Sequence, residues 1–150
     1  MKLIVVAWAA ASLAVSAARA DSVSADQASE ADLPKIGDIM TMQQMRHIKL
    51  WFAGRADNWP LADYELGKLK DGFDDVNKQL GGDLVEKTVG PGLEALEKAI
   101  DAKDRAAFSD AFDRLSAGCS SCHRTLDHAY IVIQRPASQP YSDQSFAPPK

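Results

Sequence analysis

Cys119, Cys122 and His123 form the most chemically specific group in this chain, in the order Cys-Ser-Ser-Cys-His. Two cysteines at this spacing can each form a thioether with a vinyl group of haem, and the adjacent histidine can bind the iron through a ring nitrogen. Because the chain has only 2 cysteines, no other pair competes for this role. The motif therefore predicts one covalently attached haem c, with Cys119 and Cys122 as its attachment points and His123 as the proximal iron ligand.

Three other interpretations of the cysteine pair stay open. A thioredoxin-like dithiol needs a strand–helix–strand context, and no strand pattern of any length is evident in the sequence. A structural zinc site needs four ligands, and the remaining histidines, His47 and His128, offer no second paired motif. The third alternative is an interaction module without haem. Haem attachment is the interpretation that the motif favours.

The first 20 residues resemble a secretory signal peptide. Lys2 provides a positive start, an apolar run covers residues 3–15, and residues 18–20 are typical of a cleavage site. An uncleaved membrane anchor is the alternative, but the apolar run is shorter than the ~20 residues of a spanning helix. We therefore expect a periplasmic protein with no membrane insertion after signal removal. Residues 21–33 are small, polar and acidic, which predicts a flexible leader.

The charge of the chain argues against nucleic acid as a partner. The formal net charge is −4 at pH 7, and removal of the cationic Lys2 and Arg19 with the signal peptide takes it to −6. Negative charge disfavours association with phosphate backbones and anionic membranes, so a neutral or cationic redox partner protein fits better. The carboxylates fall on expected solvent faces and no nucleophile–base pair is evident, so we do not predict an enzyme.

Apolar residues recur at helical spacing in four segments of the chain. Gly54 is expected to end the first helix, and a glycine-rich loop over residues 81–92 is expected to precede a short third helix. The apolar stripe of the last expected helix includes both cysteines and places them on its core-facing side. Asp101 or Asp104 is suited to cap the N-terminus of this helix. The expected helices cover residues 34–53, about 61 to 80, 93–102 and about 104 to 129.

The end of the chain differs in character from the helical part. A short β-branched run at residues 131–133 is followed by four prolines, which predicts an extended tail that either covers a haem edge or lies loose. The predicted fold is therefore all-α: an antiparallel four-helix bundle over residues 34–130 with a C-terminal extended tail over residues 131–150. Cofactor sites in such bundles lie between facing helices.

A C-x-x-C-H motif on the last of four amphipathic helices resembles class II cytochromes c, the cytochrome c-prime family and its low-spin relatives. The stretch LEALEKAIDAKDRAAFSDAFDRLSAGCSSCH, residues 93–123, looks like the third and fourth helices of that family, and the rest is similar in architecture only. The resemblance implies that Cys119 and Cys122 carry the thioethers and that His123 is the proximal ligand. It also implies a homodimer built on the first two helices.

One residue near the motif departs from the family pattern. Family members usually carry a basic residue four positions after the ligand histidine, whereas this chain has Asp127. Its carboxylate either accepts a hydrogen bond from the free ring nitrogen of His123, which would lower the reduction potential, or lies in solvent. The solvated interpretation is favoured.

The resemblance implies two functions that differ in the sixth iron ligand. Six-coordinate members resemble electron carriers and usually place a methionine of the first helix on the iron, whereas five-coordinate members bind small gases such as nitric oxide. Met40 lies nearest that methionine position, and His47 lies on the same stripe roughly 10 Å along the helix axis, so only one reaches the iron. We expect a mono-haem cytochrome that transfers single electrons, with Met40 as candidate sixth ligand and His47 as the alternative. A peroxidase with His47 as distal base is a further alternative.

Aromatic and basic side chains near the first two helices allow two interpretations each. Trp51 and Trp59 either pack on the porphyrin or hold the helix corner, and the structural role is favoured. Arg46 and Arg55 are candidate partners of the haem propionates, because guanidinium binds carboxylate with two hydrogen bonds.

Overall fold

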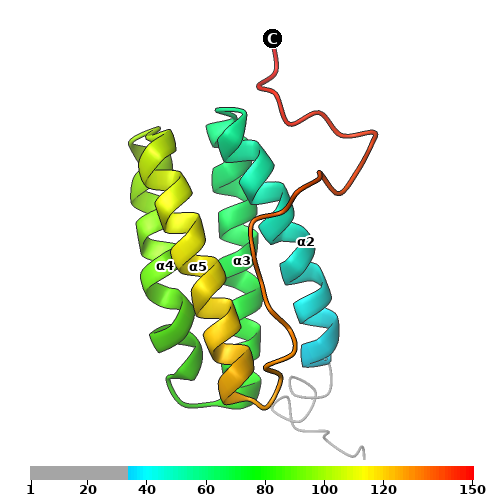
Figure 1. The fold of residues 1–150 in the computed structure, drawn as a ribbon, viewed down its shortest axis with the longest axis vertical. Coiled ribbons are helices and arrows are strands. Elements are labelled where there is room, and N and C mark those ends of the chain that lie inside the picture. Colours follow the sequence, from blue (N-terminus) through cyan, green and yellow to red (C-terminus); the bar gives the residue numbers. More distant parts are fainter. Residues whose placement is uncertain (1–33) are drawn as a thin grey trace, which may run out of the picture. The chain divides into compact units, whose positions relative to one another are not determined.

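The computed structural model describes residues 34–150, so the predicted signal peptide and leader lie outside the described residues. Four helices make up most of this part: α2 (Ile36–Arg55), α3 (Trp59–Leu80), α4 (Leu84–Asp101) and α5 (Arg105–Thr125). Successive helices run in opposite directions and pack side by side (Figure 1). The predicted all-α, four-helix class is thus confirmed. Within residues 34–150, none of the helices has the length and apolar character needed to cross a membrane.

Helix α4 begins earlier than the sequence predicts. The expected loop over residues 81–92 is wrong, because α4 starts at Leu84 and runs through Pro91. A proline in a helix removes one hydrogen bond and crowds the preceding turn. The helix buries one continuous apolar stripe: Val85, Val89, Leu93, Leu96, Ala99 and Ile100. Burial of this stripe outweighs the unfavourable helix propensity of proline and glycine.

Three helices end in a left-handed residue that is not glycine. Asp57, Lys103 and Asp127 have φ angles of 58°, 54° and 62°. After each, an N–H donates to a carbonyl five residues earlier: Asn58 to Ala53 (3.0 Å), Asp104 to Ala99 (2.9 Å) and His128 to His123 (2.8 Å). This is the Schellman arrangement of a helix C-terminus. It ends α5 at Thr125, short of the expected end near Ala129, and reverses the chain there. The side chain of Asp104 caps α5 as predicted.

The bundle consists of two tightly packed helix pairs. A Cβ atom at Gly118 of α5 would lie 2.2 Å from the carbonyl oxygen of Thr88, and one at Gly92 of α4 would lie 2.6 Å from the Cα of Leu115. Glycine at these positions lets α4 and α5 approach at backbone distance. Between α2 and α3, Gln43 Nε2 donates to the Leu69 carbonyl at 2.7 Å. Because the helices within each pair are packed so closely, the space inside the bundle lies between the two pairs.

We expect Gly118→Ala to destabilise the protein by about 3 kcal/mol, since the added methyl group would overlap backbone that cannot rotate away. Gly67→Ala is the matched control, because a Cβ there meets nothing within 4 Å. It should stabilise α3 by ~0.5–1 kcal/mol through helix propensity. Urea unfolding midpoints would measure both variants. Equal midpoints would mean that the α4–α5 contact tolerates a side chain.

Aromatic side chains fill the bundle where α2 leads into α3. Trp51 packs on Phe112 with ring centroids 4.8 Å apart, and Trp59 meets Phe108 edge-on at 6.1 Å. A Cβ at Gly54 would lie 2.3 Å from the Phe108 ring, so Gly54 lies inside α2 and makes room for that ring instead of ending the helix. The tryptophans have the structural role that the sequence favoured.

The tail from residue 131 onward forms no helix or strand and runs back along the bundle between α5 and α2 (Figure 1). Its Arg135 makes two 2.7 Å bonds to the Asp113 carboxylate of α5 and lies over the Trp51 ring of α2 at 4.9 Å. Further on, Phe146 is buried, and its carbonyl accepts a hydrogen bond from Asn58 at 3.2 Å. The tail is therefore docked on the bundle rather than loose.

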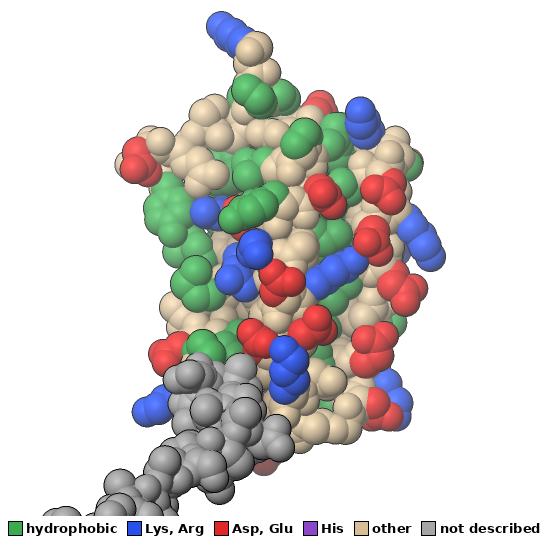
Figure 2. All heavy atoms as spheres, turned by 180° about the vertical axis from the view of Figure 1, so that it is seen from behind, with side chains coloured by type: hydrophobic (Ala, Val, Ile, Leu, Met, Phe, Trp, Pro, Cys, Tyr) green, Lys and Arg blue, Asp and Glu red, His purple; other side chains and the backbone are tan. Residues whose placement is uncertain are grey.

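Acidic and basic side chains are interspersed on the face of the bundle shown in Figure 2. Three pairs on α3 or between α3 and α4 lie within 3 Å: Lys68–Asp71 (2.9 Å), Lys70–Glu97 (2.7 Å) and Lys78–Asp75 (2.9 Å). Exposed pairs of this kind contribute little to stability, because solvent screens them. Their main consequence is that this face carries both signs of charge and presents no continuous basic surface.

Candidate functional site

A cavity of about 590 Å³ lies inside the bundle near the end where α3 leads into α4. This is a typical volume for a site that buries a small molecule or cofactor. All five predicted site residues line it: Met40, His47, Cys119, Cys122 and His123. The remaining wall is largely apolar and includes Leu69, Phe73, Val76, Val85, Val89 and Leu115. Residues that are far apart in the sequence thus meet around one largely apolar space between the two helix pairs.

Cys119 and Cys122 lie one helical turn apart on α5 and are not joined by a disulfide. Burial, reinforced by the neighbouring Cys122, raises the pKa of the Cys119 thiol to about 12. A dithiol that attacks disulfides instead needs a thiol with a lowered pKa, as in thioredoxin, where it is about 7. In the described part of the chain no three His, Cys, Asp or Glu side chains gather as a metal-binding group. The site thus gives no support to the dithiol or zinc interpretation.

The half-buried His123 ring is oriented by the tail. Its Nδ1 lies 3.1 Å from the carbonyl oxygen of Ile131. Because a carbonyl only accepts hydrogen bonds, Nδ1 carries the proton and the lone pair lies on Nε2. That is the tautomer an iron ligand requires. The hydrogen bond from His123 Nδ1–H is therefore accepted by this carbonyl and not by the Asp127 carboxylate. Asp127 instead forms the left-handed turn after α5.

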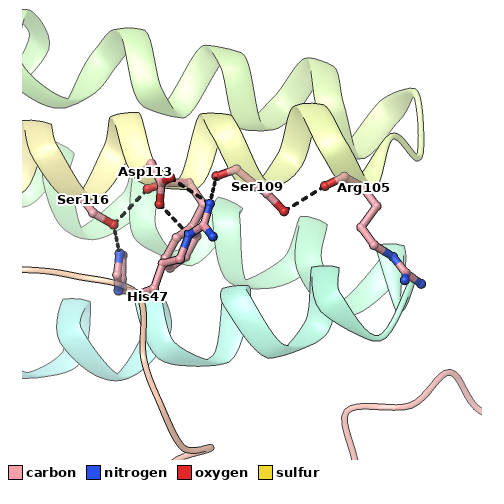
Figure 3. A network of polar contacts seen from close by, with 7 residues as sticks. His47, Arg105, Ser109, Asp113 and Ser116 are labelled. Carbon is pink, nitrogen blue, oxygen red and sulfur yellow. Dashed lines mark hydrogen bonds and ion pairs between the residues drawn. The ribbon is translucent and has the colours of Figure 1, made fainter.

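His47 is buried between α2 and α5 and held by Ser116 (Figure 3). Its Nε2 lies 2.8 Å from Ser116 Oγ, and that hydroxyl donates its single proton to the Phe112 carbonyl at 2.9 Å. Nε2 is therefore the donor of the pair. The ring also packs on Phe112 with centroids 4.2 Å apart. Burial lowers the pKa of His47 to about 4, so the side chain is neutral at physiological pH.

The burial of His47 predicts a stability loss in mild acid. The unfolded chain takes up a proton near the ordinary pKa of 6.5, whereas the folded protein does so only near 4. Between these values the unfolded state binds more protons, so stability falls as the pH falls, by ~3 kcal/mol in total. Denaturant unfolding at pH 7 and pH 4 should show this loss, and His47→Gln should lack that component. An unchanged pH dependence in His47→Gln would contradict the assignment.

The contact between His47 and Ser116 shows at which height along the bundle axis the other site residues lie. Helices α2 and α5 run in opposite directions (Figure 1). Met40 lies seven residues before His47 on α2, and His123 lies seven residues after Ser116 on α5. Seven residues span two turns, or ~10 Å, along each helix toward the same end of the bundle. Met40 and His123 therefore lie at the same level of the cavity, and His47 lies about two turns away from it.

Two further predicted residues, Arg46 and Arg55, have other contacts. Arg46 donates to the Lys68 carbonyl at 2.6 Å, and Arg55 lies over the Trp51 ring at 5.6 Å; neither lines the cavity. Glu65 is an exception to the expectation of solvated carboxylates. It is buried on α3 with Lys49 at 3.6 Å, and burial raises its pKa. It does not line the cavity either.

Sequence reasoning did not identify the polar side chains behind the site or the contribution of the tail to its wall. Ser116 and Ser120 are buried on α5, and Ile131 and Ile133 of the tail line the cavity. A second cavity of about 230 Å³ shares His47 and Ile133 with the first. A serine every fourth position on the buried side of a helix was the one available signal. In comparisons with known proteins, no protein-family model, no curated protein and no solved structure matches the chain.

Proposed function

We propose that this chain is a mono-haem c-type cytochrome that transfers single electrons in the periplasm. The observation that carries the proposal is the largely apolar cavity of about 590 Å³ whose wall holds Cys119, Cys122 and His123 of the C-x-x-C-H motif. Cys119 and Cys122 would hold the haem by thioethers, and His123 would bind its iron through Nε2. Met40, at the same level on the facing helix, would be the sixth ligand.

The protein around the cavity suits a one-electron carrier. Haem, when bound, supplies the one-electron couple between its ferric and ferrous states. The surrounding valine, leucine and phenylalanine side chains exclude water, and the close packing of α4 on α5 keeps the attachment helix rigid. His47 is uncharged, so it places no fixed charge near the cofactor. Few polar groups would need to reorient when the charge of the cofactor changes.

An exposed apolar surface next to the motif suits a transient protein contact. Tyr130 is 79 % exposed and Val132 is 68 % exposed, and both flank Ile131, which touches His123. Transient redox contacts are small, and apolar side chains without paired charges are readily desolvated there. A redox partner protein would approach the cofactor here. The negative charge of the chain favours a neutral or cationic partner.

Optical spectra of the purified oxidised and reduced protein test the proposal. We expect haem absorption that stays with the polypeptide under denaturing conditions, a low-spin ferric form, and a reduced form that resists carbon monoxide and nitric oxide. A high-spin ferric form whose reduced state binds these gases readily would instead favour a gas-binding haem protein. Absence of haem after expression in a host that attaches haem to exported proteins would refute both.

A further inference from the structure

Ser120, the first residue between the two cysteines, fastens the C-terminal tail to α5. Its Oγ accepts a hydrogen bond from the Ile133 N–H at 3.0 Å and lies 3.3 Å from the Ile133 carbonyl. The same hydroxyl donates to the Ser116 carbonyl at 3.0 Å. Ser120 is buried, so these bonds are shielded from water. The neighbouring Ser121 makes no side-chain hydrogen bond in the described structure, although its carbonyl accepts one from Thr125.

The turn after α5 brings the tail back to the motif. Asp127 adopts the left-handed conformation, His128 N–H donates to the His123 carbonyl at 2.8 Å, and Ile131 N–H donates to the His128 carbonyl at 2.9 Å. These bonds reverse the chain within a few residues. The Ile131 carbonyl thereby lies 3.1 Å from Nδ1 of His123. Ile133 then reaches Ser120, one turn closer to the start of the helix.

A second anchor holds the tail beyond Ser120. Arg135 forms two bonds to the Asp113 carboxylate and lies against the Trp51 ring. The segment from Ile131 to Arg135 is thus held at three points along α5. Two of its residues also face the cavity. The tail is therefore a structural part of the site.

We propose that this segment is a strap that positions the proximal histidine: Ser120 holds the strap, and the Ile131 carbonyl fixes the orientation and tautomer of His123. This inference rests on the proposed haem function for its effect on iron. Ser120 and Ile131 are positioning residues, because they act on the iron only through His123. A hydrogen bond from Nδ1–H to a carbonyl makes the imidazole a stronger donor, which favours the oxidised metal. The strap lowers the reduction potential in this way.

Ser120→Ala in the full-length, haem-loaded protein tests the proposal, with Ser121→Ala as the matched control in the same motif. We expect Ser120→Ala to speed amide exchange of Ile133 and to weaken the Nδ1–H signal of His123 in the reduced protein. We also expect its reduction potential to rise by ~30 mV. For a one-electron couple this corresponds to about a threefold change in the redox equilibrium constant. Ser121→Ala should leave all three unchanged. Asp127→Asn should too, because asparagine tolerates the left-handed turn.

The possible results separate the strap from the haem function. Equal Ile133 exchange and equal His123 signals in the two serine variants would refute the strap. Faster exchange with an unchanged potential would refute the positioning role. A potential that shifts in Asp127→Asn instead would show that the carboxylate is the partner of His123. A protein purified without haem would refute the proposed function, while Ile133 exchange and the His123 tautomer would still decide whether the strap exists.

Discussion

The double substitution Cys119→Ala with Cys122→Ala is expected to abolish covalent haem attachment. Both cysteines line the same cavity, one turn apart on α5. With no other cysteine in the chain, no side chain remains that can form a thioether. Haem would then be extractable into acidified organic solvent, whereas it should stay with the native polypeptide. This is a complete loss rather than a graded one.

Single substitutions and a neighbouring control make the result specific. Cys119→Ala and Cys122→Ala alone should each leave one thioether, so part of the haem stays bound through the other cysteine. Ser121→Ala keeps the motif and should behave as the native chain does. Haem that stays covalently bound in the double variant would show that attachment uses another group. Native protein without haem absorption would contradict the whole assignment.

The helices were predictable because the pattern that defines them is local. Buried residues recur at three- and four-residue spacing on α2, α3 and α5, and Gly81 ends α3 with a φ of 68° where the sequence places a stop. The candidate site was predictable for a similar reason. A five-residue motif identifies three of its members, and the stripe on the first helix identifies Met40 and His47.

The rest depends on contacts between residues that are distant in sequence. Pro91 lies inside α4 because burial of the whole stripe decides the helix, which no local propensity shows. Asp57, Lys103 and Asp127 turn the chain without glycine, so the usual helix-stop signal is missing. The tail returns to His123 through bonds between Ser120 and Ile133, 13 residues apart. Only the folded structure shows that Ser120, inside the motif, has a hydrogen-bond partner in the tail.

Met40 and His47 are the two candidates for the sixth ligand of the proposed haem iron, and the geometry separates them. His47 Nε2 is held by Ser116, its ring is packed on Phe112, and it lies about two turns above the level of His123. A move to the iron would break the bond to Ser116, at a cost of ~0.5–1.5 kcal/mol, and would leave that hydroxyl with only its bond to the Phe112 carbonyl. Met40 has the flexible side chain of a methionine and lies at the level of His123.

Met40→Ala is therefore expected to convert a low-spin ferric haem to a high-spin one that binds carbon monoxide in the reduced state. Because methionine ligation raises the potential, this variant should also have a lower potential than the native protein. Met42→Ala is the control, since Met42 lies on the same helix but is 51 % exposed and does not line the cavity.

His47→Ala tests the competitor in the same measurement. It should keep the low-spin spectrum, because Met40 would still bind, while losing stability through the empty space next to Phe112. Loss of the low-spin spectrum in His47→Ala but not in Met40→Ala would reverse the assignment and require α2 to slide by about two turns relative to α5. The close packing of Gln43 on α3 resists such a slide. In the proposed haem protein the register of α2 against α5 would select the ligand, and the two variants would measure that register through the spectrum of the haem.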